Sequence, residues 1–362
     1  MLIGATLGRY FSARFLRMIL AVFGTVFVLV YTLDFVELMR RAGDAEGASA
    51  RLMATLALLR TPTVAEQVLP FAVLFGSMAT LLTLSRKLEL VVARAAGVSV
   101  WQFLQPAFFV ALAIGVVSVT AYNPLAALLK QHATSIEARI FAKSSKASSG
   151  KDLWIRQRSV DGQAIIRAES AIDAAGALAR VTAFVYEPGG AFRERIEAPL
   201  ARLHDGYWEF QDARVLSVGE EPQNYGAYLL ATTLDPAQVR QSFTPPETVP
   251  FWQLSTVIER TERAGLDATA YRLHRDVLLA RPLLFVAMVL VAASVSLRFF
   301  RFGGVARMVL GGVAAGFMLY VATELMEDLG ASGLVGPVVA AWFPAVVGSL
   351  LGALALLHQE DG

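Results

Sequence analysis

Residues 95–129 read AAGVSVWQFLQPAFFVALAIGVVSVTAYNPLAALL and contain no charged side chain. A bilayer core of about 30 Å is crossed by about 20 helical residues, so this run is long enough to span a membrane. Arg94 precedes the run and Lys130 follows it. The stretch therefore predicts a membrane-spanning segment with a charge at each end.

The composition of the 362-residue chain also indicates a membrane protein. Hydrophobic residues make up 56% of the chain and charged residues only 17%, and the mean hydropathy is +0.53. A soluble chain has about a quarter charged residues. The net charge is +2 and no basic run is interleaved with aromatic residues, so we expect no nucleic-acid partner. The lack of cysteine excludes disulfides, thiolate nucleophiles and cysteine-ligated zinc.

Six uncharged runs are candidate spans, three before a polar region and three after it. Three of the runs are only 16 residues long, and a buried helix of a soluble protein would also fit them. The runs are 18–33, 67–85, 95–129, 282–297, 308–323 and a segment within 329–359.

Basic residues beside the spans predict their direction. Nine basic residues and one acid, Glu89, flank the span ends that share one side of the membrane. The segment between the last two spans carries no basic residue between Leu325 and Leu334. By the positive-inside rule, both termini are expected in the cytoplasm and the polar region outside it.

The polar region has the pattern of a β-domain. Residues 130–281 hold 38 of the 62 charged side chains. Turn pairs such as Asp161-Gly162 and Asp205-Gly206 separate short β-type runs at 164–168, 179–187, 191–203 and 207–218. We expect an antiparallel β-sandwich or jellyroll-like domain. Residues 251–281 then regain a helical period.

The predicted fold is thus an α-helical membrane protein with six transmembrane helices, three plus three, and an inserted antiparallel β-domain. The expected parts are residues 1–129, residues 130–270 with the β-domain and a re-entry helix, and residues 271–362.

Common catalytic motifs are absent from the sequence. The four histidines form no H-E-x-x-H pair, and the chain has neither a phosphate-binding G-x-x-x-x-G-K-[ST] loop nor a G-x-S-x-G elbow. We therefore expect no catalytic residue and no metal site, and the chain is not expected to be an enzyme.

The segment between the second and third spans, SRKLELVVARAAGVS (85–99), predicts a short helix that stops at Gly97. Such a helix at the cytoplasmic surface suits the groove of a partner ATPase. A competing interpretation is an amphipathic helix that lies on the membrane without a partner.

Several motifs, in their order along the chain, resemble the LptF/LptG permease family, the membrane subunits of the lipopolysaccharide exporter of Gram-negative bacteria. The first two motifs resemble the LptG branch more than the LptF branch. The motifs are LGRYFSARFL (7–16), DFVELMRRAG (34–43), ELVVARAAGVS (89–99), Asn123-Pro124, and the re-entry residues Gly265, Asp267, Tyr271 and Pro282.

The resemblance implies an ABC transporter in the bacterial inner membrane, with the middle domain in the periplasm. This chain would pair with an LptF-like sister permease above an LptB-like ATPase dimer, where ATP and Mg would bind; this chain would hold no cofactor. Lipopolysaccharide would pass to an LptC-like single-span bridge protein. Two alternatives are a permease for another envelope lipid or lipoprotein and a non-transporting membrane scaffold with a β-domain.

The resemblance also implies site residues. The coupling helix corresponds to residues 86–98, which places Glu89, Leu90, Arg94 and Gly97 at the ATPase. A competing interpretation pairs Glu89 with Arg86 or Lys87 in an exposed network.

Lipid phosphates call for cations at the outer membrane level. This argument, together with the resemblance, gives six lipid-contacting candidates, although Glu37 is also spaced to pair with Arg41. Asp34 is a departure, because other LptG members tend to carry a basic residue there. The candidates are Asp34, Glu37, Arg40, Arg41, Lys130 and Arg139.

Overall fold

The computed structural model describes residues 5–42, 49–141, 153–159, 162–171, 177–187, 189–217, 219, 221–232, 245–263, 267–302 and 305–360. Two compact units are formed. The helical unit contains the described residues up to Ile140, Pro246–Leu254 and those from Thr269 onward, and the β-unit contains those within Phe141–Pro245 and Ser255–Ala268.

The helical unit contains six helices that are long and apolar enough to cross a membrane, which confirms the predicted spans. The helices are α1 (Ala5–Ala42), α2 (Ala50–Arg86), α4 (Val100–Val117) continued by α5 (Asn123–Phe141), α8 (Thr269–Phe302), α9 (Val305–Ala331) and α10 (Pro337–Glu360). Helices α1, α2, α8 and α9 are longer than the uncharged runs that predicted them, because charged residues near their ends stay helical.

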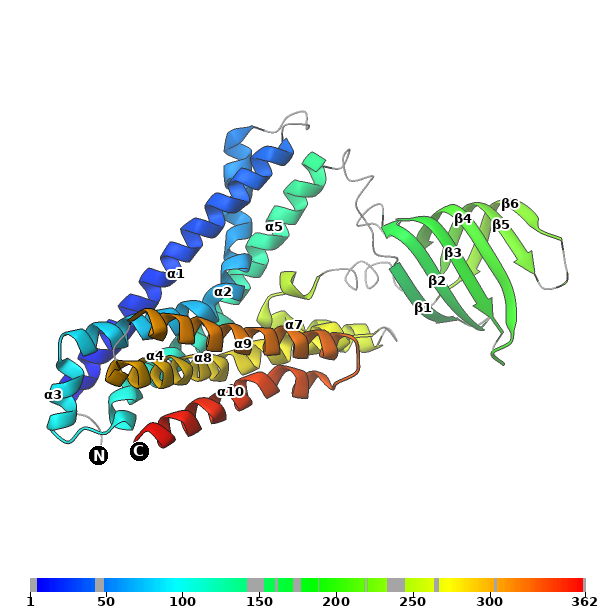
Figure 1. Cartoon of the computed structure of the whole chain (residues 1–362). Coiled ribbons are helices and arrows are strands. Elements are labelled where there is room, and N and C mark those ends of the chain that lie inside the picture. Colours follow the sequence, from blue (N-terminus) through cyan, green and yellow to red (C-terminus); the bar gives the residue numbers. More distant parts are fainter. Residues whose placement is uncertain are drawn as a thin grey trace. The chain divides into compact units, whose positions relative to one another are not determined.

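Figure 1 shows that α1 begins and α10 ends at the same end of this unit. The short helix α3 (Glu89–Ala95) lies at that end as well. The other ends of α1, α2 and α5 diverge from those of α8, α9 and α10. The segment predicted as a coupling helix therefore lies at the end of the unit that holds the start of α1 and the end of α10.

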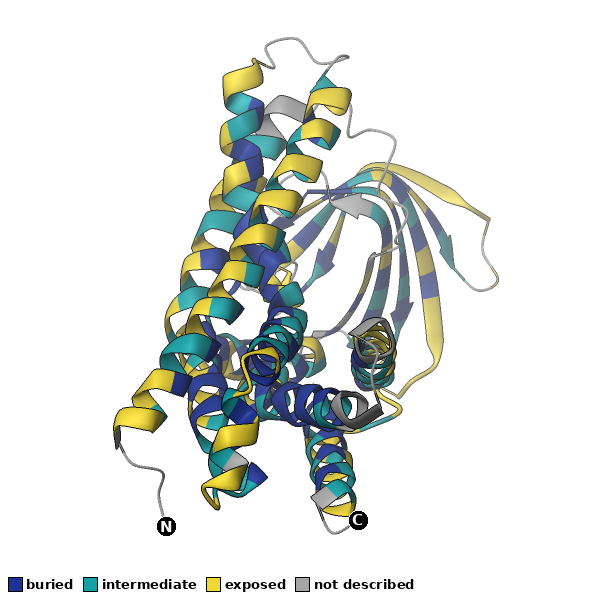
Figure 2. Ribbon diagram, turned by 60° about the vertical axis from the view of Figure 1, so that its left-hand side comes forward, coloured by how far each residue is buried: buried dark blue, intermediate teal, exposed yellow. Residues whose placement is uncertain are grey.

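Apolar packing joins the helices that precede the β-unit in sequence to those that follow it. Helix α1 packs on α2, and α8 packs on α2, α4, α9 and α10. Phe15, Phe103 and Phe285 are among the fully buried side chains of this core. Figure 2 shows that buried residues line the faces where helices meet, while much of α1 is exposed.

Small residues allow helices to approach closely inside the chain. A Cβ on Gly76 would lie 2.6 Å from the Ile19 backbone, and one on Gly115 would lie 2.5 Å from Cα of Pro282. The glycine pairs of the last two helices likewise face this chain's own side chains: Gly312 and Gly316 face Met78 and Leu74, Gly348 faces Leu319, and Gly352 faces Leu290.

The β-unit is one antiparallel sheet in which each strand pairs with the next, in the order β1-β2-β3-β4-β5-β6. This confirms the inserted antiparallel domain, and the predicted runs correspond to β2 to β5. The strands are β1 (Leu153–Ser159), β2 (Gly162–Ala171), β3 (Ala177–Tyr186), β4 (Phe192–His204), β5 (Tyr207–Ser217) and β6 (Gln223–Ala231).

The sheet curls so that a side chain of its first strand reaches its last strand. Gln157 of β1 donates to the Ala231 carbonyl of β6 at 3.3 Å and accepts from the Trp208 indole at 3.0 Å. The fully buried Trp208 lies in a core that also contains Ile166 and Phe210. Across the curve, Tyr228 donates to Glu194 at 2.9 Å; burial and this carboxylate raise the pKa of Tyr228 to about 12, so its hydroxyl remains a donor.

The return to the membrane helices is broken into pieces. A 3₁₀ turn (Pro246–Thr248) is followed by α7 (Phe251–Arg263), and α8 begins separately at Thr269. The helical period over residues 251–281 therefore covers two helices. Gly265 lies outside the described residues.

Replacement of Gly115 by alanine should destabilise the helical unit, because the new Cβ would clash with the Pro282 backbone. We expect a loss of about 1–3 kcal/mol in the free energy of unfolding, as for overpacked cores. Denaturant unfolding of the purified chain in detergent measures it.

Gly24→Ala is the matched control, since a Cβ on Gly24 meets nothing within 4 Å. Alanine there should be neutral or stabilising by up to about 1 kcal/mol. Equal stabilities of the two variants would contradict the packing account.

Candidate functional site

The loop between α2 and α4 contains α3, and local signals determine its limits. Gly97 adopts φ +85°, and the Val98 N–H donates to the Ala93 carbonyl at 3.1 Å. This is the Schellman arrangement in which glycine ends a helix. Ser99 then caps α4 in a reciprocal pair with Gln102. Residues 97–99 thus separate α3 from the third span.

Glu89, the first residue of α3, is bonded to α1. Nη1 of Arg14 lies 3.0 and 3.1 Å from the two Glu89 carboxylate oxygens, and the Tyr10 hydroxyl donates to one of them at 3.2 Å. The pair is partly buried. The ion-pair partner of Glu89 is therefore Arg14, and not Arg86 or Lys87. The carboxylate ties α3 to the first span and remains partly accessible.

The apolar residues of this segment point in two directions. Leu90 is buried in the core of the helical unit, whereas Leu88, Val91 and Val92 are exposed. The side chain of Arg94 lies outside the described residues. Leu90 fastens α3 to the bundle, and the three exposed side chains form an apolar surface that the sequence analysis did not identify.

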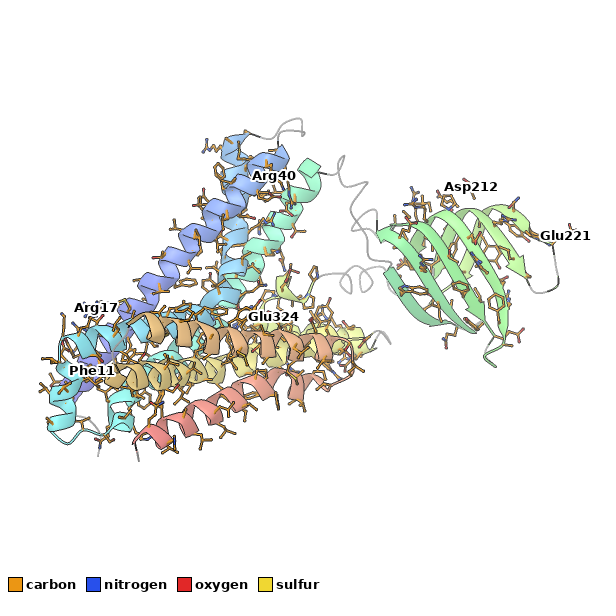
Figure 3. The ribbon with its side chains drawn as sticks, in the orientation of Figure 1. Phe11, Arg17, Arg40, Asp212, Glu221 and Glu324 are labelled. Carbon is orange, nitrogen blue, oxygen red and sulfur yellow. The ribbon has the colours of Figure 1, made fainter. Side chains whose placement is uncertain are left out.

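At the opposite end of α1, two arginines share one acid. The guanidinium groups of Arg40 and Arg41 donate to the Glu37 carboxylate at 2.8–3.0 Å. All three side chains are exposed, and Figure 3 shows Arg40 far from Phe11 and Arg17, which lie toward the other end of α1. The i, i+4 pairing of Glu37 with Arg41 is present, and the cluster keeps one excess positive charge.

Arg60 of α2 joins three helices at the same level. Its Nη1 lies 2.6 Å from Glu137 of α5, and its Nη2 lies 3.5 Å from Asp34 of α1. Asp34 therefore faces a cation from the neighbouring helix. Lys130 lies 3.6 Å from Glu247, and the Arg139 side chain lies outside the described residues.

A third polar region lies within the helical unit. Glu66 of α2 and Arg281 of α8 form an ion pair, and the Asn123 amide donates to Glu66 at 3.1 Å. These residues line a cavity of about 470 Å³ whose walls are partly apolar and partly polar, with Glu324 and Glu327 among them. Charges at this depth are costly unless they are paired, so they mark functional candidates.

The sequence analysis missed Arg14, Arg60, Glu66 and Arg281. Glu66 and Arg281 immediately precede the uncharged runs that begin at Gln67 and Pro282, so hydropathy places both at the boundaries of the predicted spans. The structure continues both helices through them. The sequence did offer one signal for Glu66 and Arg281. Each charge directly adjoins an uncharged run, and the helical pattern continues on its other side.

Comparison with known proteins agrees with this architecture. Residues 9–358 match the family described as "Lipopolysaccharide export system permease LptF/LptG". The chain is also similar to the lipopolysaccharide export system permease protein LptG of Escherichia coli strain K12, with 22% identity over 93% of this chain and 94% of that protein. The LptG of Escherichia coli O6:H1, strain CFT073, gives the same values. With its six membrane helices and inserted antiparallel sheet, the chain belongs to the LptF/LptG family of lipopolysaccharide export permeases.

Proposed function

We propose that the chain is the LptG-like membrane subunit of an ABC transporter that extracts lipopolysaccharide from the inner membrane and passes it to a periplasmic bridge. ATP with Mg would be hydrolysed in a separate subunit. The observation that carries this proposal is α3, which joins two spans of a permease-family chain and exposes apolar side chains beside a Glu89–Arg14 pair.

The contacts of α3 explain how a movement of the ATPase would be transmitted to the membrane spans. Leu90 is packed in the bundle core, and Glu89 is bonded to Arg14 of α1. Any displacement of α3 therefore pulls on α1 and α2 together. Leu88, Val91 and Val92 are left to contact an ATPase groove, and the Glu89 carboxylate would accept from a basic residue of that subunit.

Other surfaces fit the remaining partners. Helices α1 and α9 bury little of their apolar surface within the chain, so lipid and an LptF-like sister permease would cover them. The ATPase would be an LptB-like dimer, with α3 and both termini in the cytoplasm. The β-unit would lie in the periplasm, where an LptC-like single-span protein continues the bridge.

The outer cations would receive the lipid phosphates. Arg40 and Arg41 are exposed and both pair with Glu37, so a phosphate would meet two guanidinium groups beside this acid. Arginine suits phosphate because its planar fork donates two parallel hydrogen bonds. Arg60 and Lys130 are paired with acids of other segments and would act by holding those segments in place around the lipid.

Glu89→Ala should lower ATP hydrolysis by the copurified complex in nanodiscs by about tenfold, because a charge-assisted contact is lost. If the Glu89 carboxylate also reaches the ATPase, Arg14→Ala should lower ATP hydrolysis less than Glu89→Ala does. If the carboxylate only holds α1, the two variants should lower ATP hydrolysis equally. Glu259→Ala, which removes another helix glutamate paired with an arginine, is the control.

Retained activity and retained ATPase binding in Glu89→Ala would remove Glu89 from the coupling joint. A purified chain that carries no ATPase would support the scaffold interpretation instead.

The double variant Arg40→Ala/Arg41→Ala should weaken lipopolysaccharide binding to the permease complex by about tenfold, since two charge-assisted donors are lost. Glu37→Gln should not weaken binding, because the competing acid is removed. Kd for purified lipopolysaccharide measures both effects, with Arg260→Ala/Arg263→Ala as the control. Equal affinities of the native chain and the Arg40/Arg41 variant would show that these arginines serve only the surface of α1.

A further inference from the structure

The Asn123-Pro124 pair lies where the third span departs from a regular α-helix. A π-helix, Ser118–Tyr122, connects α4 to α5, and the Asn123 N–H donates to the Ser118 carbonyl five residues before it. In an α-helix, residue 124 would donate to the carbonyl of Thr120, but proline has no N–H and its ring would crowd that carbonyl. The wider turn relieves the crowding and leaves the Thr120 carbonyl able to accept from elsewhere.

The chain that returns from the β-domain uses both groups. The Trp252 indole donates to the Thr120 carbonyl at 3.1 Å, and the Phe251 N–H donates to Oδ1 of Asn123 at 3.1 Å. The Phe251 N–H is the first of α7, and such N–H groups have no partner within their own helix. A side chain from another helix thus supplies the cap of α7.

The same asparagine also faces the interior of the helical unit. Its Nδ2 donates to Glu66, which is paired with Arg281 of α8. Asn123 is 2% exposed, so neither end of its amide has water as a substitute. A flip of the amide by half a turn would bring Nδ2 toward the Phe251 N–H, so that two donors meet, and Oδ1 toward the Glu66 carboxylate, so that two acceptors meet. One side chain therefore joins α2, α5 and the start of α7 in a single arrangement.

Two further contacts hold the returning segment along α5. Gln131 donates to the Thr248 carbonyl at 2.7 Å, and Lys130 lies 3.6 Å from Glu247. The segment 246–252 is therefore attached to the third span at four positions. Because α5 also leads into the β-domain, the chain leaves the third span and is fastened back to it on its return.

We propose that Asn123 is a positioning residue that fastens the return from the β-domain to the third span, so that both connections of the β-domain move with α5. When the membrane helices rearrange, segment 246–252 keeps its place on α5 and follows it. This role rests on the proposed function, since it assigns the joint through which helix movement would reach the periplasmic domain.

Spin-label distances test the joint in the full chain. The chain has no cysteine, so His132→Cys and Gln253→Cys place one label on α5 and one on α7, both at exposed positions of the helical unit. In nanodiscs the native background should give one narrow distance distribution, which stays the same when the complex is trapped with ATP and vanadate. A distribution that shifts with nucleotide in the native background would overturn the proposal.

Two substitutions remove the joint to different degrees. Trp252→Phe removes only the exposed indole donor and should preserve folding, whereas Asn123→Leu removes both amide contacts at similar volume. We expect the population of detached segment to rise about fivefold for each lost hydrogen bond, seen as a broader distribution. Trp101→Phe, on the same span but outside the joint, should leave the distribution narrow.

Transport measurements separate this inference from the proposed function. If the native complex releases lipopolysaccharide with ATP, the joint variants should keep their ATPase rate and release about fivefold less lipid per ATP. Variants with native distances and native release per ATP would refute the role of Asn123. A native complex that releases no lipid would refute the proposed function, while the label distances would still decide the joint.

Discussion

The pairing of Glu66 with Arg281 inside the membrane unit constrains the arrangement of the helices around it. Removing either partner would leave the other buried charge without its ion-pair partner, which typically costs several kcal/mol. The backbone of Pro282, next to Arg281, packs so closely on Gly115 of α4 that no Cβ would fit between them. Asn123 donates to Glu66. The first and second sets of spans therefore meet at a point where charge pairing, a small residue and an amide must all fit together.

Polar contacts at the two ends of the helices differ in kind from this central pair. At α3, Glu89 and Leu90 attach a short helix to α1 and to the core, and three apolar side chains remain outside. At the opposite end, Arg60 holds α1, α2 and α5 through two acids, whereas Arg40 and Arg41 pair with Glu37 of their own helix. The groups that are paired across helices hold those helices together, and the exposed groups are the ones that the proposed function assigns to partners.

The β-unit has no disulfide and depends on curvature for its core. A flat sheet of six strands would bury neither face, but curling brings β1 to β6 and encloses Trp208 and Phe210. Gln157 makes this possible, because its amide satisfies the Trp208 indole and the Ala231 carbonyl within the closed end. A buried polar group without such a partner would cost about 1–3 kcal/mol.

The sequence by itself determined the features that depend on neighbouring residues. Six spans follow from hydropathy because each membrane helix must satisfy its backbone groups within itself. The stop at Gly97 follows because a glycine adopts positive φ at little cost, and alternating runs predicted β2 to β5. Only the tertiary structure decided which distant groups meet: Glu89 with Arg14, Glu66 with Arg281, Asn123 with Phe251, and Gln157 with Ala231. Each of these partners lies more than 70 residues away, and helix packing or sheet curvature selects it from several residues of the same chemistry.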